Sequence, residues 1–410
     1  MTKTIKLAVV AVLALGATSA FATNGDLMIG QGAKSRSMGG VGIAKAFGAE
    51  SALANPANIS SVKDMEATLA VTVFMPTVSF DGPVNGFGST GYADSSANLS
   101  VIPEIYYSAR LSENLVTGIA IAGTAGMGVD YVGKSNGSNE MFSELSLLKV
   151  AVPVSYSMGG LTFGVAGILQ YGSLEIDLIS PVPADAGARI GKGASTDIGY
   201  GVEAGVTYTT GGLTLGAVYK SKIGMTYDNT ISTALGKFDA ILGNAASAAV
   251  TSGDNLDQPA ERGVGISYVM GANTLSADYK NIAYGDAAGY ANFGWEDQDV
   301  YAVGYEYAAD TWALRAGYNY AKSPIVEQNG NTPGGAVQNF FNLAGFPGVI
   351  ETHYAIGGGY NITKDFALDG SFIYAPETTV TTNTTGIGGG TDTSVKHSQM
   401  AVTIAGTYAF

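Results

Sequence analysis

The sequence has no cysteine, and only two of its 410 residues are histidines. Disulfides and thiolate chemistry are therefore excluded, and so small a supply of ligands does not suit a zinc site. We expect no metal, no cofactor and no enzymatic activity. A barrel lipase is the enzymatic alternative, and it would need a histidine hydrogen-bonded to a serine and oriented by a third group.

Charge is also scarce, and long apolar runs are missing. Charged residues make up 13% of the chain, whereas a soluble protein has about 25%. No segment after the N-terminus has 18 consecutive apolar residues, so the chain does not read as a helical membrane protein. The formal charge of −14 argues against nucleic acid as a partner. The 58 glycines and 23 tyrosines instead favour an outer-membrane β-barrel.

The N-terminus predicts export. Lys3 and Lys6 precede an apolar run over 7–15, and Ala20 and Ala22 form a small-x-small site. This pattern is typical of a secretory signal peptide, and the run is too short to span a membrane. We expect cleavage after Ala22, which takes the formal charge from −14 to −16 because both lysines are lost.

From about residue 65 onward the chain alternates large apolar residues with small or polar ones. The last run, HSQMAVTIAGTYAF, puts Met400, Val402, Ile404, Tyr408 and Phe410 on one face and small residues on the other. Period-two alternation predicts strands with one face toward lipid and the other toward the lumen. A closing strand with a terminal aromatic residue also resembles the signal that the barrel-insertion machinery recognises. We therefore expect Phe410 to contact this machinery.

The connections between these runs alternate in length. Tight turns are expected at 112–114, 158–160, 209–212, 271–273, 308–310 and 363–365, and long links lie between them. Six turns and seven long links join fourteen strands, and an even number is usual for a bacterial barrel. The predicted fold is therefore all-β, a transmembrane antiparallel barrel of about fourteen strands.

Two long links carry apolar clusters. The residues that we single out for ligand capture are Leu235, Phe238 and Leu242 in one link and Phe340, Phe341 and Phe346 in the other. Residues 231–249 follow helical spacing. Exposed apolar surface on such a loop marks a binding site. The alternative is a lid in which the loops pack on each other.

The mature chain resembles the FadL family of outer-membrane transporters for long-chain fatty acids and other hydrophobic compounds. The resemblance rests on GQGAKSRSMGGVGIAKAFGAESALANPANIS near the N-terminus, GIAIAGTAGMGVDY, GVEAGVTYTTGGLTLGAVYKSKIGMTY and WALRAGYNYAKSPI, in that order. The first stretch is similar to the family's hatch and includes its Asn55-Pro56-Ala57 motif. Within it, Pro56 is expected to stop a helical turn over 50–54 and direct the chain to the first strand.

The resemblance implies three parts: a signal peptide over 1–22, a partly helical hatch over 23–64 that plugs the lumen, and a barrel over 65–410. It also implies capture of ligand at the outer loops, transfer to an apolar lumen pocket, and lateral release through a kink in the third strand. The family often has Pro-Phe-Gly at that kink, where this chain has Thr124, Ala125 and Gly126. Gly123, Gly126 and Gly128 are the residues expected to make the bend.

Charged residues with lumen parity have two interpretations. Lys220 and Arg315 are candidates to meet a ligand carboxylate. The alternative is an internal lattice of ion pairs that anchors the hatch. The partners expected for the chain are a fatty acid or hydrocarbon, outer-membrane lipid and lipopolysaccharide, with a monomer as the expected assembly.

The sequence thus predicts passive uptake of hydrophobic small molecules, most simply long-chain fatty acids, across the bacterial outer membrane. A general diffusion porin is one alternative, and it would conduct ions in planar bilayers. A surface adhesin or phage receptor is another, and it would lose cell binding when its loops are deleted.

Overall fold

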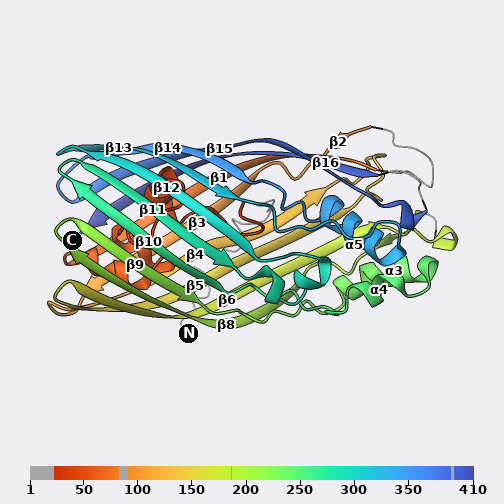
Figure 1. The fold of residues 1–410 in the computed structure, drawn as a ribbon, viewed down its shortest axis with the longest axis horizontal. Helices are drawn as coiled ribbons and strands as arrows, with labels where there is room; N and C mark the ends of the chain where they lie inside the picture. Colours follow the sequence, from red (N-terminus) through yellow and green to blue (C-terminus); the bar gives the residue numbers. More distant parts are fainter. Residues whose placement is uncertain (1–22, 83–90, 186, 389–391) are drawn as a thin grey trace.

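The computed structural model describes residues 23–82, 91–185, 187–388 and 392–410. The predicted signal peptide and its cleavage site lie outside the described residues. The chain forms one antiparallel sheet that closes when β16 pairs with β1, from Glu66 opposite Ala409 to Asp81 opposite Ser394. Figure 1 shows the resulting barrel from the side. The predicted fold class is confirmed.

Fourteen strands build the wall, and each pairs with its neighbours in chain order. They are β1 (Met65–Asp81), β3 (Ser100–Arg110), β4 (Leu115–Asp130), β5 (Phe142–Met158), β6 (Leu161–Ile179), β8 (Ser195–Thr210), β9 (Leu213–Lys220), β10 (Glu261–Met270), β11 (Asn273–Ile282), β12 (Gln298–Ala308), β13 (Trp312–Ala321), β14 (Thr352–Asn361), β15 (Phe366–Thr382) and β16 (Thr393–Ala409). Two-residue strands, β2 (Ala93–Asp94) and β7 (Arg189–Ile190), pair with the last residues of β1 and β6 respectively.

Most strands of the wall fall into two length classes. Strands β9 to β14 contain 8 to 11 residues, whereas β4, β5, β6, β8, β15, β16 and β1 contain 16 to 19. About 9 to 11 tilted residues cross a bilayer. The short strands therefore just span a membrane, and the long ones continue beyond it at the end opposite the tight turns.

The outer face carries the expected alternation. On β12, Tyr301, Val303, Tyr305 and Tyr307 are exposed, and the residues between them are buried. The alternation stops at Ala308, the exposed last residue of the strand. Away from the tight turns, the strand register places Tyr279 of β11 opposite Tyr301 of β12, and Tyr301 opposite Tyr320 of β13. These three tyrosines form one aromatic level. A lower level near the turns contains Tyr307, Trp312, Tyr360, Tyr408 and Phe410. Two such girdles bound the lipid-facing band of an outer-membrane barrel. Among the described residues, no helix is long and apolar enough to cross a membrane.

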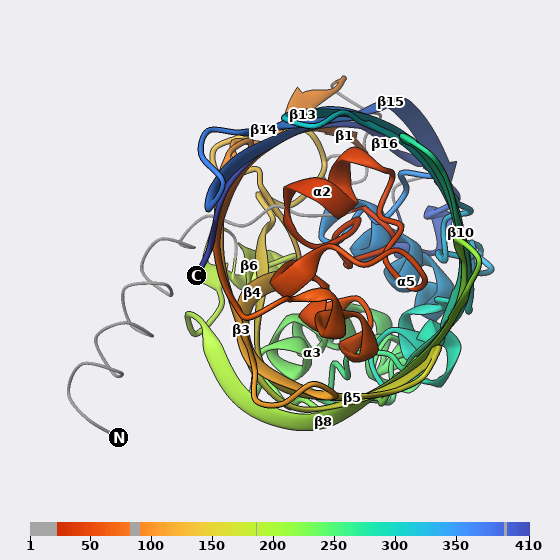
Figure 2. The ribbon, with the colours of Figure 1, turned by 90° about the vertical axis from the view of Figure 1, so that its left-hand side faces the viewer.

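Residues 23–64, which we call the hatch, lie inside the barrel near the turn end. Figure 2 shows this segment filling the lumen. It contains α2 (Gly32–Ser37) and two 3₁₀ helices, η1 (Gly48–Leu53) and η2 (Pro56–Ser61). Its side chains are mostly buried, including the whole of Arg36.

The sequence predicted that the chain would pass from Pro56 directly to the first strand. In the structure a further short helix lies between them. Pro56 begins η2, with Asn55 as the N-cap and an Ala57 N–H to Asn55 Oδ1 bond of 3.0 Å. Proline suits the first position of a helix, because its missing N–H would have no partner there and its φ is already helical. The motif therefore ends one short helix and starts another.

The long links at the opposite end form a second layer, which we call the lid. It includes α3 (Ile231–Leu242) and α4 (Ala245–Ala249) after β9, η4 (Tyr284–Asp286) and η5 (Ala291–Phe293) after β11, and α5 (Pro333–Ala344) after β13. Two smaller turns, η3 (Pro183–Asp185) and η6 (Thr385–Ile387), complete the helical elements. The helical spacing predicted α3 correctly. Helix α5 was not predicted, although Thr332 caps it by accepting from Gly335 N at 3.3 Å and Pro333 occupies its first turn.

Candidate functional site

The ladder between β3 and β4 stops partway up the wall. Glu104 opposite Ala122 is the last pair, although both strands continue. Pro103 follows on β3 and offers no N–H to either neighbour. On its other edge β4 shifts register against β5, because Gly123 faces Leu148 and Ala125 faces Leu147. Thr124 is thus an inserted residue, a β-bulge, and bulges bend a strand.

The start of the hatch fills the place that β3 leaves. Met28 N donates to Thr124 O at 3.0 Å, and Gly126 N donates to Asp26 O at 3.0 Å. Residues 26–28, which we call the arm, therefore pair with β4 from inside the lumen. At the bulge the barrel wall is closed by three residues of the hatch in place of a neighbouring strand.

The glycines predicted for the bend lie at and above this bulge. A Cβ at Gly123 would come within 2.7 Å of Ile102 Cγ2, so the strand can approach β3 here only without a side chain. Gly126 donates to the arm. Gly128 sits in regular pairing opposite Glu144.

The arm is fixed to the lid by Asp26. Tyr284 donates to Oδ1 at 2.6 Å, Tyr290 donates to Oδ2 at 2.8 Å, and Gln258 Nε2 lies 3.4 Å from Oδ2. Burial raises the pKa of Asp26 above its usual value, although these hydrogen bonds favour the charged form. The two tyrosine rings pack against Trp295, with centroids 5.0 and 4.8 Å away.

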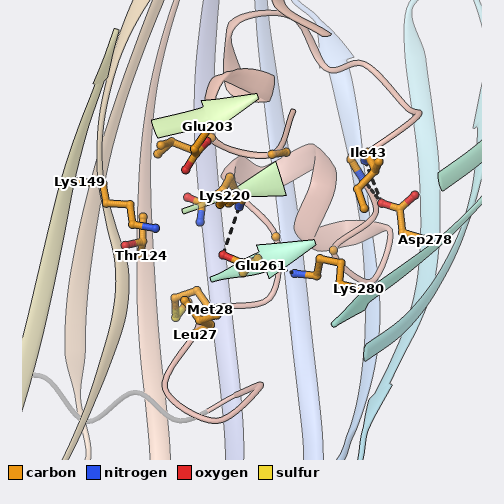
Figure 3. Close-up of a pocket in the computed structure, with 16 residues that line it drawn as sticks. Leu27, Met28, Ile43, Thr124, Lys149, Glu203, Lys220, Glu261, Asp278 and Lys280 are labelled. Atoms are coloured by element: carbon orange, nitrogen blue, oxygen red, sulfur yellow. Dashed lines mark hydrogen bonds and ion pairs between the residues drawn. The ribbon is translucent and has the colours of Figure 1, made fainter. Parts of the chain in front are cut away.

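A polar cavity of about 40 Å³ lies beside the arm and the bulge, room for two or three water molecules. Figure 3 shows its lining, which includes Leu27, Met28, Thr124, Lys149, Glu203, Lys220, Glu261, Asp278 and Lys280. The resemblance implied an apolar pocket in the lumen. This cavity is charged instead, with lysines and carboxylates from five wall strands.

Most of these charges are already paired. Glu261 holds Lys220 at 3.4 Å and Lys280 at 3.7 Å. Asp278 accepts from the backbone N–H of Gly42 and Ile43 at 2.7 and 2.9 Å and so fastens the hatch to β11. Lys220, predicted as a ligand contact, therefore lines the cavity but has a carboxylate partner.

Lys149 is different. It is 6% exposed, and among the described residues no carboxylate lies within ion-pair distance of its amino group. Lys149 lies opposite Ala122 of β4, two residues from Thr124, and both side chains line the cavity (Figure 3). Sequence reasoning missed Lys149, although its lumen parity with Leu145, Leu147 and Ala151 could have revealed it.

A second, apolar pocket of about 20 Å³ lies higher, between β4, β6 and the lid. It is lined by Met127, Leu174, Ile176, Ile231, Leu256, Tyr290, Phe293, Trp295, Asn342 and Phe346. Met127 is three residues along β4 from Thr124, and Tyr290 also holds Asp26. The apolar pocket and the polar cavity are thus neighbours along β4 and the arm.

The residues predicted for ligand capture mainly form the lid core. Leu235, Phe238, Phe340 and Phe341 are buried, and the ring centroids of Phe238 lie 5.7 and 5.4 Å from those of Phe340 and Phe341. Leu242 packs against this cluster. Of the six, Phe346 is the one that lines the apolar pocket.

The hatch motif contacts the wall closely. Asn55 Nδ2 donates to Ile43 O at 2.7 Å within the hatch. A Cβ at Gly164 of β6 would come within 2.1 Å of Ala57 N, so the motif lies directly on the strand backbone. Asn55, Pro56 and Ala57 are therefore a packing element of the hatch.

Ion pairs secure the other sides of the hatch. Arg36 bonds Glu104 of β3 and also donates to Thr72 Oγ1 of β1 at 2.8 Å. Lys45 meets Glu306 at 2.8 Å, and Lys34 meets Asp369 at 3.7 Å. Arg315, the second predicted ligand contact, lies between these wall carboxylates at 2.7 Å from each.

The comparisons with known proteins agree with this architecture. A model of the family described as outer membrane protein transport protein (OMPP1/FadL/TodX) matches residues 9–410. The chain belongs to this family. Its members are outer-membrane transport proteins rather than enzymes, and the chain is accordingly placed in the bacterial outer membrane with its short turns on the periplasmic side.

Solved structures of OMPP1/FadL/TodX proteins share the fold. A FadL homologue of Pseudomonas aeruginosa has a TM-score of 0.72 at 16% identity, covering 94% of this chain and 100% of that one. The toluene transporter TodX of Pseudomonas putida has a TM-score of 0.67 at 20% identity, covering 93% and 99%. The toluene transporter TbuX of Ralstonia pickettii has a TM-score of 0.61 at 18% identity, with the same coverage.

A curated relative matches a smaller part of the chain. It is the uncharacterized protein in the phosphoenolpyruvate carboxykinase gene 5′ region of Chlorobium limicola, 40% identical over 81 residues. The match spans 19% of this chain and 40% of that protein.

Proposed function

We propose that the chain takes up hydrophobic compounds with an anionic head group, typified by long-chain fatty acids, and releases them sideways into the membrane. The observation that carries the proposal is that one cavity adjoins both the interrupted wall at Thr124 and a buried lysine, Lys149, that has no ion-pair partner among the described residues. Ligand would enter through the lid, place its tail in the apolar pocket and its head group in the polar cavity.

Lys149 is the proposed contact for the head group. Glu203 lines the same cavity but makes no ion pair with Lys149. A buried ammonium without a carboxylate at ion-pair distance is unfavourable, so a ligand carboxylate beside Lys149 would compensate its desolvation. Thr124 Oγ1 has no hydrogen-bond partner among the described residues and adjoins the same cavity. A carboxylate held there would be at the break in the wall.

Lateral release is supported by how firmly the hatch is held. Its contacts reach β1, β3, β11, β12 and β15 through hydrogen bonds and ion pairs. By contrast, the wall at the bulge is closed by the arm, through two backbone hydrogen bonds. A long tail also gains about 0.8 kcal/mol per CH₂ by staying in apolar surroundings, which favours an exit into lipid over one into water.

The test is binding and uptake of oleate by Lys149→Met, with Lys149→Arg as the charge-retaining control. A hydrogen bond to a charged group contributes roughly 1.5–3 kcal/mol, so we expect oleate affinity to fall about tenfold or more in the methionine variant. The arginine variant should retain most of it. Unchanged oleate binding by Lys149→Met would refute the head-group assignment.

A second candidate function is uptake of monoaromatic hydrocarbons, which the names of TodX and TbuX specify for those proteins. The aromatic lining of the apolar pocket, with Tyr290, Phe293 and Trp295, favours it. Toluene uptake in the same variants separates the two functions. Toluene has no charge, so its uptake should not respond to Lys149→Met, and transport of toluene without oleate would support this alternative.

A further inference from the structure

After β9 the chain leaves the wall and forms an inner layer. Residues 223–227, which we call the inner strand, pair with Gln258 and Asn255 through two isolated bridges. The inner strand lies on the lumen face of β8, because a Cβ on Gly199 of β8 would collide with Ile223 Cγ2. This part of the wall is therefore two layers thick.

Tyr227 is the last residue of the inner strand, and its side chain reaches β6. Its backbone is fixed, because its N–H donates to Asp254 O at 2.9 Å. A Cβ on Gly172 of β6 would collide with Tyr227 Oη, so the hydroxyl lies directly on the strand, where glycine leaves room for it. Tyr227 is 0% exposed, and its hydroxyl has no hydrogen-bond partner among the described residues. A buried hydroxyl without a partner is unfavourable, so a ligand that supplied one would be stabilised there.

A second unpartnered side chain lies two residues earlier on β6. Gln170 is 0% exposed, and neither the nitrogen nor the oxygen of its amide has a hydrogen-bond partner in the part of the chain that the structure describes. The strand register places Gln170 directly opposite Lys149 of β5. Gln170 therefore marks the level at which the head group would lie, beside Lys149.

The lumen face of β6 connects this level to the apolar pocket. Alternate residues of a strand point to the same side. The strip on the lumen side of β6 is buried and includes Gln170, Gly172, Leu174 and Ile176. Leu174 and Ile176 line the apolar pocket. The Tyr227 hydroxyl, at Gly172, thus lies between the head-group level and the apolar pocket.

A ligand that occupies both cavities must pass the Tyr227 hydroxyl. A plain methylene chain cannot form a hydrogen bond, so it would leave this hydroxyl buried and unpartnered. A hydroxyl carried by the chain can both donate to the phenolic oxygen and accept from it. A site that hydrogen-bonds a ligand hydroxyl discriminates strongly against the analogue that lacks it.

We propose that Tyr227 makes hydroxylated long-chain fatty acids the preferred ligands of the chain. The inference rests on the proposed uptake of compounds with an anionic head group, and it adds the class of tail. Gly172 lies two residues from Gln170, which is about 7 Å along a strand. We therefore expect the hydroxyl to be several carbon atoms from the carboxylate, rather than next to it or near the far end.

The test is isothermal titration of the full mature barrel with stearate and with hydroxystearates that carry the hydroxyl on the third, sixth or twelfth carbon. We expect the wild type to bind the sixth-carbon isomer about tenfold or more tightly than stearate. Tyr227→Phe removes only the phenolic oxygen, so it should abolish this difference and leave stearate affinity unchanged. The matched control is Tyr131→Phe, which should keep the preference. Tyr131 is also 0% exposed, with a hydroxyl that has no partner among the described residues, but it lies in the link between β4 and β5.

The preference is a ratio of two affinities within one variant, so its outcome is separate from that of the head-group assignment. Lys149→Met should weaken binding of stearate and the hydroxystearates alike and leave their ratio unchanged. A wild type that binds stearate as tightly as the sixth-carbon isomer overturns the inference about Tyr227, whatever Lys149→Met shows. A preference that persists in Tyr227→Phe, or that Tyr131→Phe also loses, overturns it too. Failure of the wild type to bind any of the four acids overturns this inference and the proposed function together.

Discussion

Asp26 is a buried carboxylate that two tyrosine hydroxyls hold, with no cation at ion-pair distance among the described residues. Its backbone oxygen binds Gly126 at the bulge while its side chain binds Tyr284 and Tyr290 of the lid. One residue therefore joins the bulge of β4 to the lid.

The charge of Asp26 should make stability depend on pH. Burial raises its pKa, so the stability contributed by its protonated form is complete below about pH 3.9, the usual value for aspartate, and is lost as the pH rises through the folded value. Acidification from neutral pH toward 4 should therefore stabilise the wild type relative to Asp26→Asn. The measurement is the temperature of the heat-dependent gel shift at several pH values, with the exposed turn residue Asp310→Asn as control.

Two variants of Asp26 separate the contribution of its hydrogen bonds to stability from the contribution of its charge. Asp26→Ala leaves the buried Tyr290 hydroxyl without its acceptor, at about 1–3 kcal/mol, although Tyr284 can still donate to Asn24 O at 2.8 Å. Asp26→Asn keeps an acceptor at this site. We expect the alanine variant to melt well below the asparagine variant. Equal melting of the two would show that the tyrosine bonds contribute little.

The lumen-facing lysine and arginine residues show what can be predicted from the sequence about single residues. Parity predicted that Lys220 and Arg315 face the lumen, and both do. It could not predict that Glu261, forty-one positions away from Lys220 in the chain, supplies its partner, because pairing across strands depends on register. Lys149 faces the lumen by the same rule, but only the three-dimensional structure shows that it has no ion-pair partner in the part of the chain that is described.

At the scale of elements, β4 combines a strand and a break. The resemblance placed a bend near Gly123 to Gly128, and the bulge falls at Thr124 within that stretch. The part played by the arm could not be predicted, because the hydrogen bonds of residues 26–28 to β4 join segments about a hundred residues apart. Likewise, the helical turn ends before Pro56 as expected, but Pro56 also begins η2, because proline is compatible both with the end of one helix and with the first position of the next.

A reversible cross-link tests the break directly. The chain has no cysteine, so Ile102→Cys/Gly123→Cys introduces a single pair, at positions where a Cβ on Gly123 would lie 2.7 Å from Ile102 Cγ2. Oxidation should fix β3 to β4 and abolish oleate uptake, and a reductant should restore it. Each single-cysteine variant is the control.

The oxidised and reduced forms of the double-cysteine variant are measured on one preparation, so the reduced form is the reference for the oxidised form. Uptake that continues after complete oxidation, verified by thiol titration, would exclude an exit between β3 and β4. Loss of uptake in both states would point to the Gly123 side chain itself, which the single variant isolates.

At the scale of the whole molecule, the barrel follows from composition and alternation. Low charge, period-two strands and alternating link lengths predicted fourteen strands, and the structure has them. The lid was harder to predict, because α5 is rich in Gly, Asn and Phe, and its position depends on contacts such as Asn342 to Trp295 Nε1 at 2.8 Å. Those contacts join loops from different hairpins.

The chain end offers a test of assembly as a whole. Phe410 is 61% exposed, and its ring rests on Tyr408 with centroids 4.8 Å apart. Its removal therefore costs the finished barrel little packing. We expect deletion of Phe410 to reduce the assembled fraction in cells while leaving the melting of the barrel that does form almost unchanged. Tyr408→Leu is the control, and normal assembly without Phe410 would show that this residue is not the recognition signal.

The attachment of the hatch to strands all around the wall also sets an order of events during biogenesis. Lys34 and Arg36 lie near the start of the chain, and their partners stretch from Glu104 on β3 to Asp369 on β15. The seam that closes the sheet joins its last strand, β16, to its first, β1. We therefore expect the hatch to lie within the curling sheet before that seam closes, and to act as the core around which the barrel is shaped.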